Sequence, residues 1–286
     1  RVVKYRGVAA VEGFHDFAIR KGGLVVFPQL IASTTATAPS EPLGSGVPEL
    51  DQLLGGGLSW GSTTLLIGPA GSGKSTLAAQ YVTAAKGRTK AAVFLFEERR
   101  ETFVGRCDVL GMGMSDRIAA GDVIITQVAP GEMSPGEFSH RVCEVVNTTG
   151  ARVVMIDSAN GYLNAIPQSG APLVRLHELL SYLNSRDVAS IIVIAQHGII
   201  GTAMATPIDL SYVADCVVLL RFFEAQGAVR KAISVVKKRT GMHESTIREL
   251  MIGPVAVRAG AALSRFQGVL TGVPTYVGTS DPLLSE

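Results

Sequence analysis

The sequence predicts an α/β fold with a mostly parallel central sheet, helices on both faces and an antiparallel C-terminal extension. Three observations predict it. Apolar runs typical of strands alternate with helical patterns through the middle of the chain. Several of these runs are continuously apolar, which is typical of parallel strands that helices cover on both faces. The last apolar runs follow one another without intervening helices, and this favours antiparallel pairing.

The alternation places the elements in order. We expect strands at residues 63–67, 91–96, 123–127, 152–157 and 190–196, and helices at 75–86, 98–110, 135–148 and 172–185. The third helix has a clear start, because Ser134 can act as N-cap, Pro135 suits the first helical position and Glu137 completes a capping box. The strands of the antiparallel extension are expected at 216–222, 229–237 and 246–252.

Composition and charge exclude several classes of protein. Of the 286 residues, 47% are hydrophobic and 17% are charged, whereas disordered chains combine low hydrophobicity with high net charge. The 26 basic and 24 acidic residues give a net charge of +2, so no global field favours a nucleic acid partner. No apolar run approaches the roughly 18 residues of a membrane span, and no leader opens the chain. We therefore expect a soluble, cytoplasmic protein.

The three cysteines, Cys107, Cys143 and Cys216, have neither metal-binding spacing nor the even number of a disulfide framework. Buried, reduced thiols are the simplest interpretation.

Two features divide the chain. Residues 32–43 are small, polar and proline-containing, which is typical of a linker. Residues 2–6 match residues 235–239 at four of five positions, with a spacing of 233, and residues 46–48 match 272–274 at a spacing of 226. Because two matches share nearly the same spacing, we expect residues 1–31 to be the C-terminal remnant of an upstream copy of the same domain.

A complete phosphate-binding motif lies between an expected strand and an expected helix. It is G-x-x-x-x-G-K-[ST], formed here by Gly68, Pro69, Ala70, Gly71, Ser72, Gly73, Lys74 and Ser75. The glycines let successive backbone N–H groups converge on phosphate oxygens, and the helix N-terminus adds partial positive charge. In such loops the lysine contacts the β- and γ-phosphates and the serine hydroxyl binds Mg²⁺. The motif predicts ATP and Mg²⁺ as ligands.

Three carboxylates can complete the site. Asp157 ends a buried strand, as in a Walker B motif, where it would hold Mg²⁺ through water. Glu97 and Glu98 follow the strand after the phosphate loop, where a base that activates the attacking nucleophile is needed. Their position is equally compatible with acids that only favour the start of the next helix.

Several motifs together carry a family resemblance. Residues 46–51 and 53–58, followed by the phosphate loop, resemble the beginning of RecA/RadA-type ATPase domains; the pair Glu97–Glu98, residues 235–243 and residues 247–249 narrow the resemblance to the KaiC family. It covers residues 44–274, leaves 275–286 as a C-terminal tail, and implies a RecA-like P-loop NTPase fold. It also implies that Glu97 and Glu98 are catalytic. KaiC proteins carry two such domains in tandem, in agreement with the interpretation of residues 1–31.

The resemblance further implies an interface site. Lys237 and Arg239 would reach the γ-phosphate of the ATP bound by a neighbouring subunit, where cations neutralise charge on the transferred group. The family forms homohexameric rings, the closed form of a head-to-tail interface, so an isolated subunit would be nearly inactive. From the residues themselves, an exposed basic strand end remains the alternative.

A second activity is also implied. Clock members of the family phosphorylate themselves on adjacent Ser and Thr, and Ser211 and Tyr212 stand at those positions. Because Tyr212 replaces the threonine, an ordered cycle of phosphorylation at two sites is not expected. Serine/threonine kinase activity at Ser211 remains open, and so does a signalling or clock-type protein partner. The tail is too short to assume a docking segment. Gln196 and His197 end the fifth strand and could sense the γ-phosphate; a structural loop role fits His197 equally well.

Two other functions compete with this one. A DNA-acting relative needs basic and aromatic pore loops, but residues 197–210 contain no Lys, Arg or aromatic side chain. A nucleotide-controlled assembly switch with little turnover is the third candidate.

Overall fold

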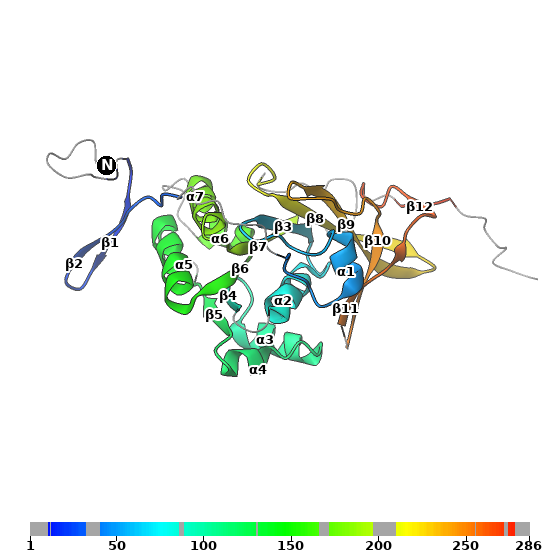
Figure 1. Ribbon diagram of the computed structural model, residues 1–286, viewed down its shortest axis with the longest axis horizontal. Coiled ribbons are helices and arrows are strands. Elements are labelled where there is room, and N and C mark those ends of the chain that lie inside the picture. The colour runs from blue at the N-terminus through cyan, green and yellow to red at the C-terminus, as the bar shows by residue number, and fades with distance from the viewer. Residues whose placement is uncertain are drawn as a thin grey trace, which may run out of the picture.

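The computed structural model describes residues 11, 13–32, 41–85, 89–129, 131–165, 172–196, 210–254, 256–271 and 274–277. A nine-stranded sheet forms the centre of the molecule, in the order β11–β10–β9–β8–β3–β7–β6–β4–β5 (Figure 1). The strands of this sheet are β3 (Thr63–Pro69), β4 (Lys90–Leu95), β5 (Val123–Gln127), β6 (Ala151–Asp157), β7 (Ala189–Gln196), β8 (Cys216–Ala225), β9 (Ala228–Lys238), β10 (Arg248–Gly253) and β11 (Ala256–Ala262).

The predicted α/β fold is confirmed. The strands from β3 to β8 pair in parallel, whereas β9, β10 and β11 form antiparallel pairs at one edge. Because β8 is parallel to β3, the antiparallel extension begins one strand later than the run of residues 216–252 suggests. Two smaller pairs lie outside the sheet: β1 (Asp16–Arg20) with β2 (Gly23–Phe27), and β12 (Phe266–Gln267) with β13 (Thr275–Tyr276).

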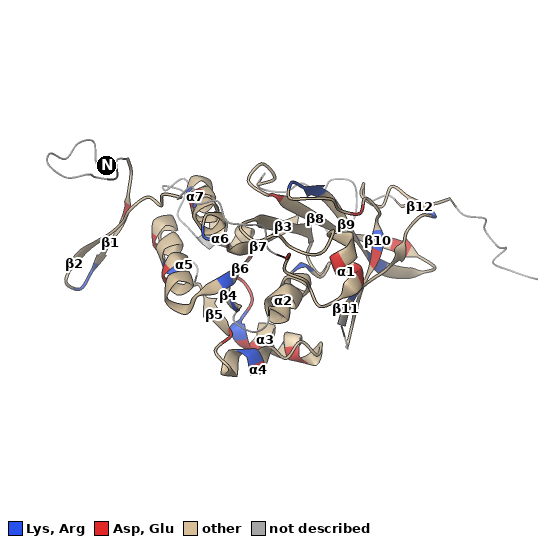
Figure 2. Ribbon diagram, viewed as in Figure 1, with Lys and Arg blue, Asp and Glu red and all other residues tan. Residues whose placement is uncertain are grey.

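Helices cover both faces of the sheet. They are α1 (Pro48–Leu53), α2 (Lys74–Ala84), α3 (Arg100–Val109), α4 (Met114–Ala119), α5 (Pro135–Thr149), α6 (Ala159–Ala165) and α7 (Pro172–Asn184). On β3, Leu66 packs into the core beneath α1 and α2, while Leu65 and Ile67 pack into the core beneath α5 and α7. The central strands are largely uncharged (Figure 2), as expected of strands buried on both sides.

The start of α5 follows the prediction in part. Ser134 is the N-cap and its hydroxyl accepts a hydrogen bond from the backbone N–H of Glu137. The Glu137 carboxylate forms an ion pair with Arg20 of β1. In a capping box, the Glu137 carboxylate would bind the backbone N–H of Ser134. Here it binds Arg20, which is distant in the sequence.

The three cysteines are buried and free, as predicted. Burial raises the thiol pKa to about 12 for Cys107 and Cys143 and to about 11 for Cys216. Within the described ranges, every helix is too short or too polar to cross a membrane. Residues 1–10 and 12, most of the predicted linker and residues 278–286 lie outside those ranges, as do residues 272 and 273 of the second internal match.

Candidate nucleotide site

The phosphate loop joins the carboxyl end of β3 to α2. Gly73 is the N-cap of α2, with a left-handed φ of 102°. A Cβ on Gly73 would lie 2.4 Å from Cδ1 of Ile252 on β10, and a Cβ on Gly68 would lie 2.5 Å from the carbonyl oxygen of Leu220 on β8. Gly68 is required because a side chain would meet the backbone of β8, and Gly73 is required because its φ lies in the left-handed region that favours glycine.

Lys74 is buried and points back across the loop. Its Nζ donates a hydrogen bond to the carbonyl oxygen of Pro69 at 2.7 Å. Burial lowers the pKa of Lys74 from 10.5 to about 8, against the opposing effect of the Asp157 and Glu97 carboxylates. A bound phosphate would favour the charged form, because a nearby anion offsets the desolvation of the ammonium.

Asp157 ends β6 beside this lysine. Burial raises the pKa of its carboxyl, while a hydrogen bond from the Ser75 hydroxyl lowers it. Its Oδ2 and the Oγ of Ser72 are buried without a hydrogen-bond partner among the described residues. Buried polar atoms normally have partners. A hydroxyl and a carboxylate side by side, with a spare oxygen, fit Mg²⁺, which takes few protein ligands and keeps several waters.

The two glutamates, which look equivalent in sequence, have different surroundings. Glu98 forms a bidentate pair with Arg106 of α3, at 2.6 Å and 3.3 Å. Arg106 also donates to the Thr76 hydroxyl at 2.7 Å. Glu97 accepts a hydrogen bond from the Ser158 hydroxyl at 3.0 Å. Both glutamates precede α3, whose N-cap is Arg99 and whose first residue is Arg100.

A cleft of about 780 Å³ adjoins the loop. Its lining includes Ser75 and Thr76 of α2, Arg106 of α3, Lys231 of β9 and Ile252 of β10. Sequence reasoning missed Arg106 and Lys231 as site residues. Neither belongs to a local motif, and only the crossing of α3 and the antiparallel edge of the sheet brings them to the phosphate loop.

Lys237 and Arg239 lie at the end of the sheet where the parallel strands begin. The phosphate loop of the same chain lies at the other end, where those strands finish. Lys238 pairs with Cys216 on β8. Cys216 in turn pairs with Thr64, near the amino end of β3. The phosphate loop leaves the carboxyl end of this seven-residue strand. At about 3.3 Å per residue, the two ends are about 20 Å apart.

Ser211 lies beside these two cations. Lys237 Nζ donates to the carbonyl oxygen of Ser211 at 2.6 Å, and Arg239 donates to that of Tyr212 at 3.2 Å. Arg239 also lies 3.7 Å from the Asp215 carboxylate. The structure thus gathers Ser211, Lys237 and Arg239 on one surface.

Gln196 lies at the phosphate edge, where it pairs in register with Pro69. Its side chain accepts a hydrogen bond from Arg221, which is buried. His197 and residues 198–209, which include most of the loop considered for DNA binding, lie outside the described residues.

Comparison with known proteins agrees with this architecture. The family model described as "ATPase: KaiC" matches residues 43–261. The circadian clock protein KaiC3 of Synechocystis sp. is 25% identical over 98% of this chain and 56% of its own length. The circadian clock oscillator protein KaiC of Synechococcus elongatus is 23% identical over 96% of the chain and 53% of its own length. The chain thus spans about half the length of the curated relatives it matches.

Proposed function

Because the chain belongs to the KaiC family of ATPases, we propose that it binds ATP with Mg²⁺ at the phosphate loop and hydrolyses it between subunits of a homohexameric ring. One observation carries the proposal. The phosphate loop and the cations Lys237 and Arg239 lie at opposite ends of the strands of one sheet, so a single chain holds two halves of a site. A neighbouring subunit in a head-to-tail ring would bring one half to the other.

Within one subunit, the loop N–H groups and Lys74 would hold the phosphates. Ser75 and Asp157 would hold Mg²⁺, whose chemistry is to neutralise charge that develops on the phosphate oxygens. The spare Oδ2 of Asp157 supports this role. Lys231 lines the same cleft, where its ammonium would add positive charge.

The surroundings of the glutamates support separate roles. Glu97, hydrogen-bonded by Ser158, is the better candidate for the base that accepts a proton from the attacking water. Glu98 accepts two hydrogen bonds from Arg106, so both of its carboxylate oxygens are already engaged. Through Thr76, the same arginine ties Glu98 to the first turn of α2. We therefore assign Glu98 to positioning and to the charge balance of the site.

Ser211 gives a second candidate activity, autophosphorylation. Its backbone carbonyl binds Lys237, one of the cations proposed to reach the neighbour's γ-phosphate. The Ser211 hydroxyl would then be close to that phosphate, and phosphoryl transfer would use the same glutamates as hydrolysis. A signalling or clock-type protein partner and a cytoplasmic location belong to this proposal, since the relatives named above are clock proteins.

A complementation experiment tests the interface site. At the site of this domain, full-length Lys74→Ala protein should neither bind nor hydrolyse ATP, and Lys237→Ala/Arg239→Ala protein should bind ATP but not turn it over; any activity of the preceding domain is the same in both and is subtracted. Mixing them should restore part of the activity, because some interfaces then pair an intact loop with intact cations. Mixtures that stay inactive while forming mixed rings would contradict the proposal.

The fate of γ-labelled ATP separates the two activities. Label released as free phosphate reports hydrolysis, and label retained on the protein reports autophosphorylation. Ser211→Ala should abolish the retained label without stopping phosphate release. Label that persists in Ser211→Ala would reject this serine as the acceptor.

A further inference from the structure

The hairpin β1–β2 lies outside the main sheet, beside α5 at one end of the molecule (Figure 1). One of its faces carries four apolar side chains that pair across the strands, Phe17 with Val26 and Ile19 with Leu24. These side chains are 58%, 48%, 81% and 60% exposed, respectively. We call these four residues the apolar face of the hairpin. Such a face on a two-stranded hairpin normally packs against something.

This hairpin matches β10–β11 position by position. The spacing of 233 that relates residues 2–6 to 235–239 also relates Phe17 to Leu250 and Leu24 to Val257. The cross-strand register is conserved, since Leu250 pairs with Ala259 and Ile252 with Val257. In this second hairpin the equivalent face is core: Leu250, Val257 and Ala259 are 3%, 0% and 4% exposed, and α1 and α2 contact β11.

The opposite face of the hairpin contacts the start of α5. The Asp16 carboxylate accepts a hydrogen bond from the backbone N–H of Gly136 at 2.6 Å. The first turn of α5 thus has two caps, Ser134 from its own chain segment and Asp16 from the hairpin. A Cβ on Gly136 would lie 2.7 Å from the Cβ of Asp16, so this contact requires glycine.

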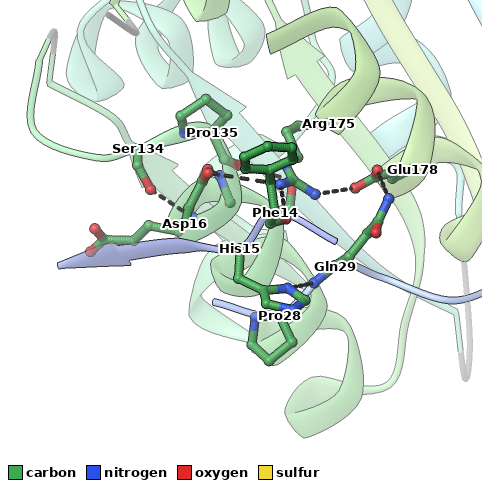
Figure 3. Close-up of polar contacts among 12 residues, drawn as sticks. Phe14, His15, Asp16, Pro28, Gln29, Ser134, Pro135, Arg175 and Glu178 are labelled. Atoms are coloured by element: carbon green, nitrogen blue, oxygen red, sulfur yellow. Dashed lines mark hydrogen bonds and ion pairs between the residues drawn. The ribbon is translucent and has the colours of Figure 1, made fainter. Parts of the chain in front are cut away.

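A polar cluster fastens the open end of the hairpin, where β1 begins and β2 ends, to α7 (Figure 3). Arg175, on α7 and only 9% exposed, donates to the carbonyl oxygen of Phe14 at 2.5 Å and to Glu178 at 2.8 Å, and lies 3.9 Å from Asp16. Gln29, just beyond β2, donates to Glu178 at 2.5 Å. A buried guanidinium with several well-placed acceptors fixes orientation, because leaving any of these groups unpaired is costly.

We propose that Asp16, Gln29, Gly136, Arg175 and Glu178, here called the Arg175 joint, fasten a preceding domain of the same fold to α5 and α7. The hairpin belongs to that domain's sheet, and its apolar face is covered by helices equivalent to α1 and α2. This inference rests on the tandem arrangement suggested by the internal matches, in which residues 1–31 end the first domain. The length of the relatives, about twice this chain, leaves room for it.

The joint lies on the other face of the sheet from α2, the helix that follows the phosphate loop. Breaking the joint therefore need not affect nucleotide binding within this domain. The joint can be tested without ATP, and failure of the proposed ATPase activity would leave the result unchanged.

Amide hydrogen exchange on the full polypeptide, with its natural sequence before Arg1 included, tests the joint. In Arg175→Met and Gly136→Ala, the first-turn amides of α5 should exchange at least about tenfold faster than in the unmodified protein. The β1–β2 amides should keep their protection, because they belong to another domain's sheet. Arg141→Ala, which removes an exposed arginine of α5 that pairs with Glu144, is the matched control and should change neither.

Three results would overturn the proposal. Unchanged exchange of the α5 first turn in both variants would show that the cluster is not a joint. Loss of β1–β2 protection together with the first turn would show that the hairpin is held by this domain and by nothing else. Protection of β1–β2 that falls on dilution would assign the apolar face to a second copy of the chain. Unchanged exchange of β3 and α2 in the same data verifies that each variant folds.

Discussion

The ammonium of Lys74 is poised to respond to pH. With a pKa near 8 instead of 10.5, it loses its proton in the nucleotide-free protein as the pH rises above 8. Binding of ATP would then require proton uptake, because the phosphates favour the charged lysine.

We therefore expect ATP affinity to be nearly constant below pH 7.5 and to fall towards about tenfold per pH unit above pH 8. Isothermal titration calorimetry in buffers of different ionisation enthalpy measures both the affinity and the proton uptake. In Lys74→Arg, the guanidinium stays charged, so any remaining affinity should be independent of pH. A flat profile for the unmodified protein up to pH 9.5 would contradict a depressed lysine pKa.

The unequal surroundings of the glutamates predict unequal variants. Glu97→Gln should bind ATP normally and lose about 10²–10⁴-fold in turnover, the usual contribution of a general base. Glu98→Gln should lose less, since its amide oxygen can still accept from Arg106. Phosphate release under saturating ATP measures both. Equal losses would remove the distinction, and full activity of the double variant would exclude both residues.

Sequence could locate these glutamates but could not tell them apart. The phosphate motif and the carboxylates at strand ends follow from local pattern, because parallel strands bring their carboxyl ends to one edge. The difference between Glu97 and Glu98 depends on Arg106 and Ser158, whose side chains reach them through the packing of α3 and the turn after β6. Such contacts have no sequence spacing of their own.

At the scale of elements, the long, strongly patterned segments were the predictable ones. The helices α2, α3, α5 and α7 and the strands β3 to β10 all have expected counterparts. The helices α1, α4 and α6 are not predicted from the sequence, because they have six, six and seven residues, too few turns for a clear helical period. The β1–β2 hairpin is predicted only as part of a remnant, because each of its strands has just five residues, too few for a clear pattern.

The capping of α5 gives a prediction at this scale. Ser134→Ala removes the hydroxyl that accepts from Glu137 N–H and should lower the free energy of unfolding by about 1 kcal/mol. Thr148→Ala is the control, since this exposed hydroxyl donates back to the Glu144 and Val145 carbonyl oxygens within the helix. Urea denaturation followed by circular dichroism compares the midpoints. A loss in Thr148→Ala as large as that in Ser134→Ala would contradict the capping role.

At the scale of the whole molecule, the phosphate loop and the cations Lys237 and Arg239, the two parts of the proposed site, lie at opposite ends of the strands of the sheet. If subunits supply each other's cations, turnover per chain depends on assembly. We expect the specific ATPase activity to fall steeply when the protein is diluted below the concentration at which rings form, as measured by light scattering in parallel. Arg239→Ala should remain slow at every concentration. Constant activity per chain in dissociated protein would indicate a complete site within one subunit.

The separation of the two half-sites also determines how damage spreads. In the proposed ring, a chain that carries both Lys74→Ala and Arg239→Ala would inactivate its own site and the site of one neighbour. If normal and variant chains mix at random in such rings, a site would work only where two adjacent chains are intact, and activity would follow the square of the intact fraction. Such a variant would act dominantly over the normal protein in the same cell, although its own fold is sound.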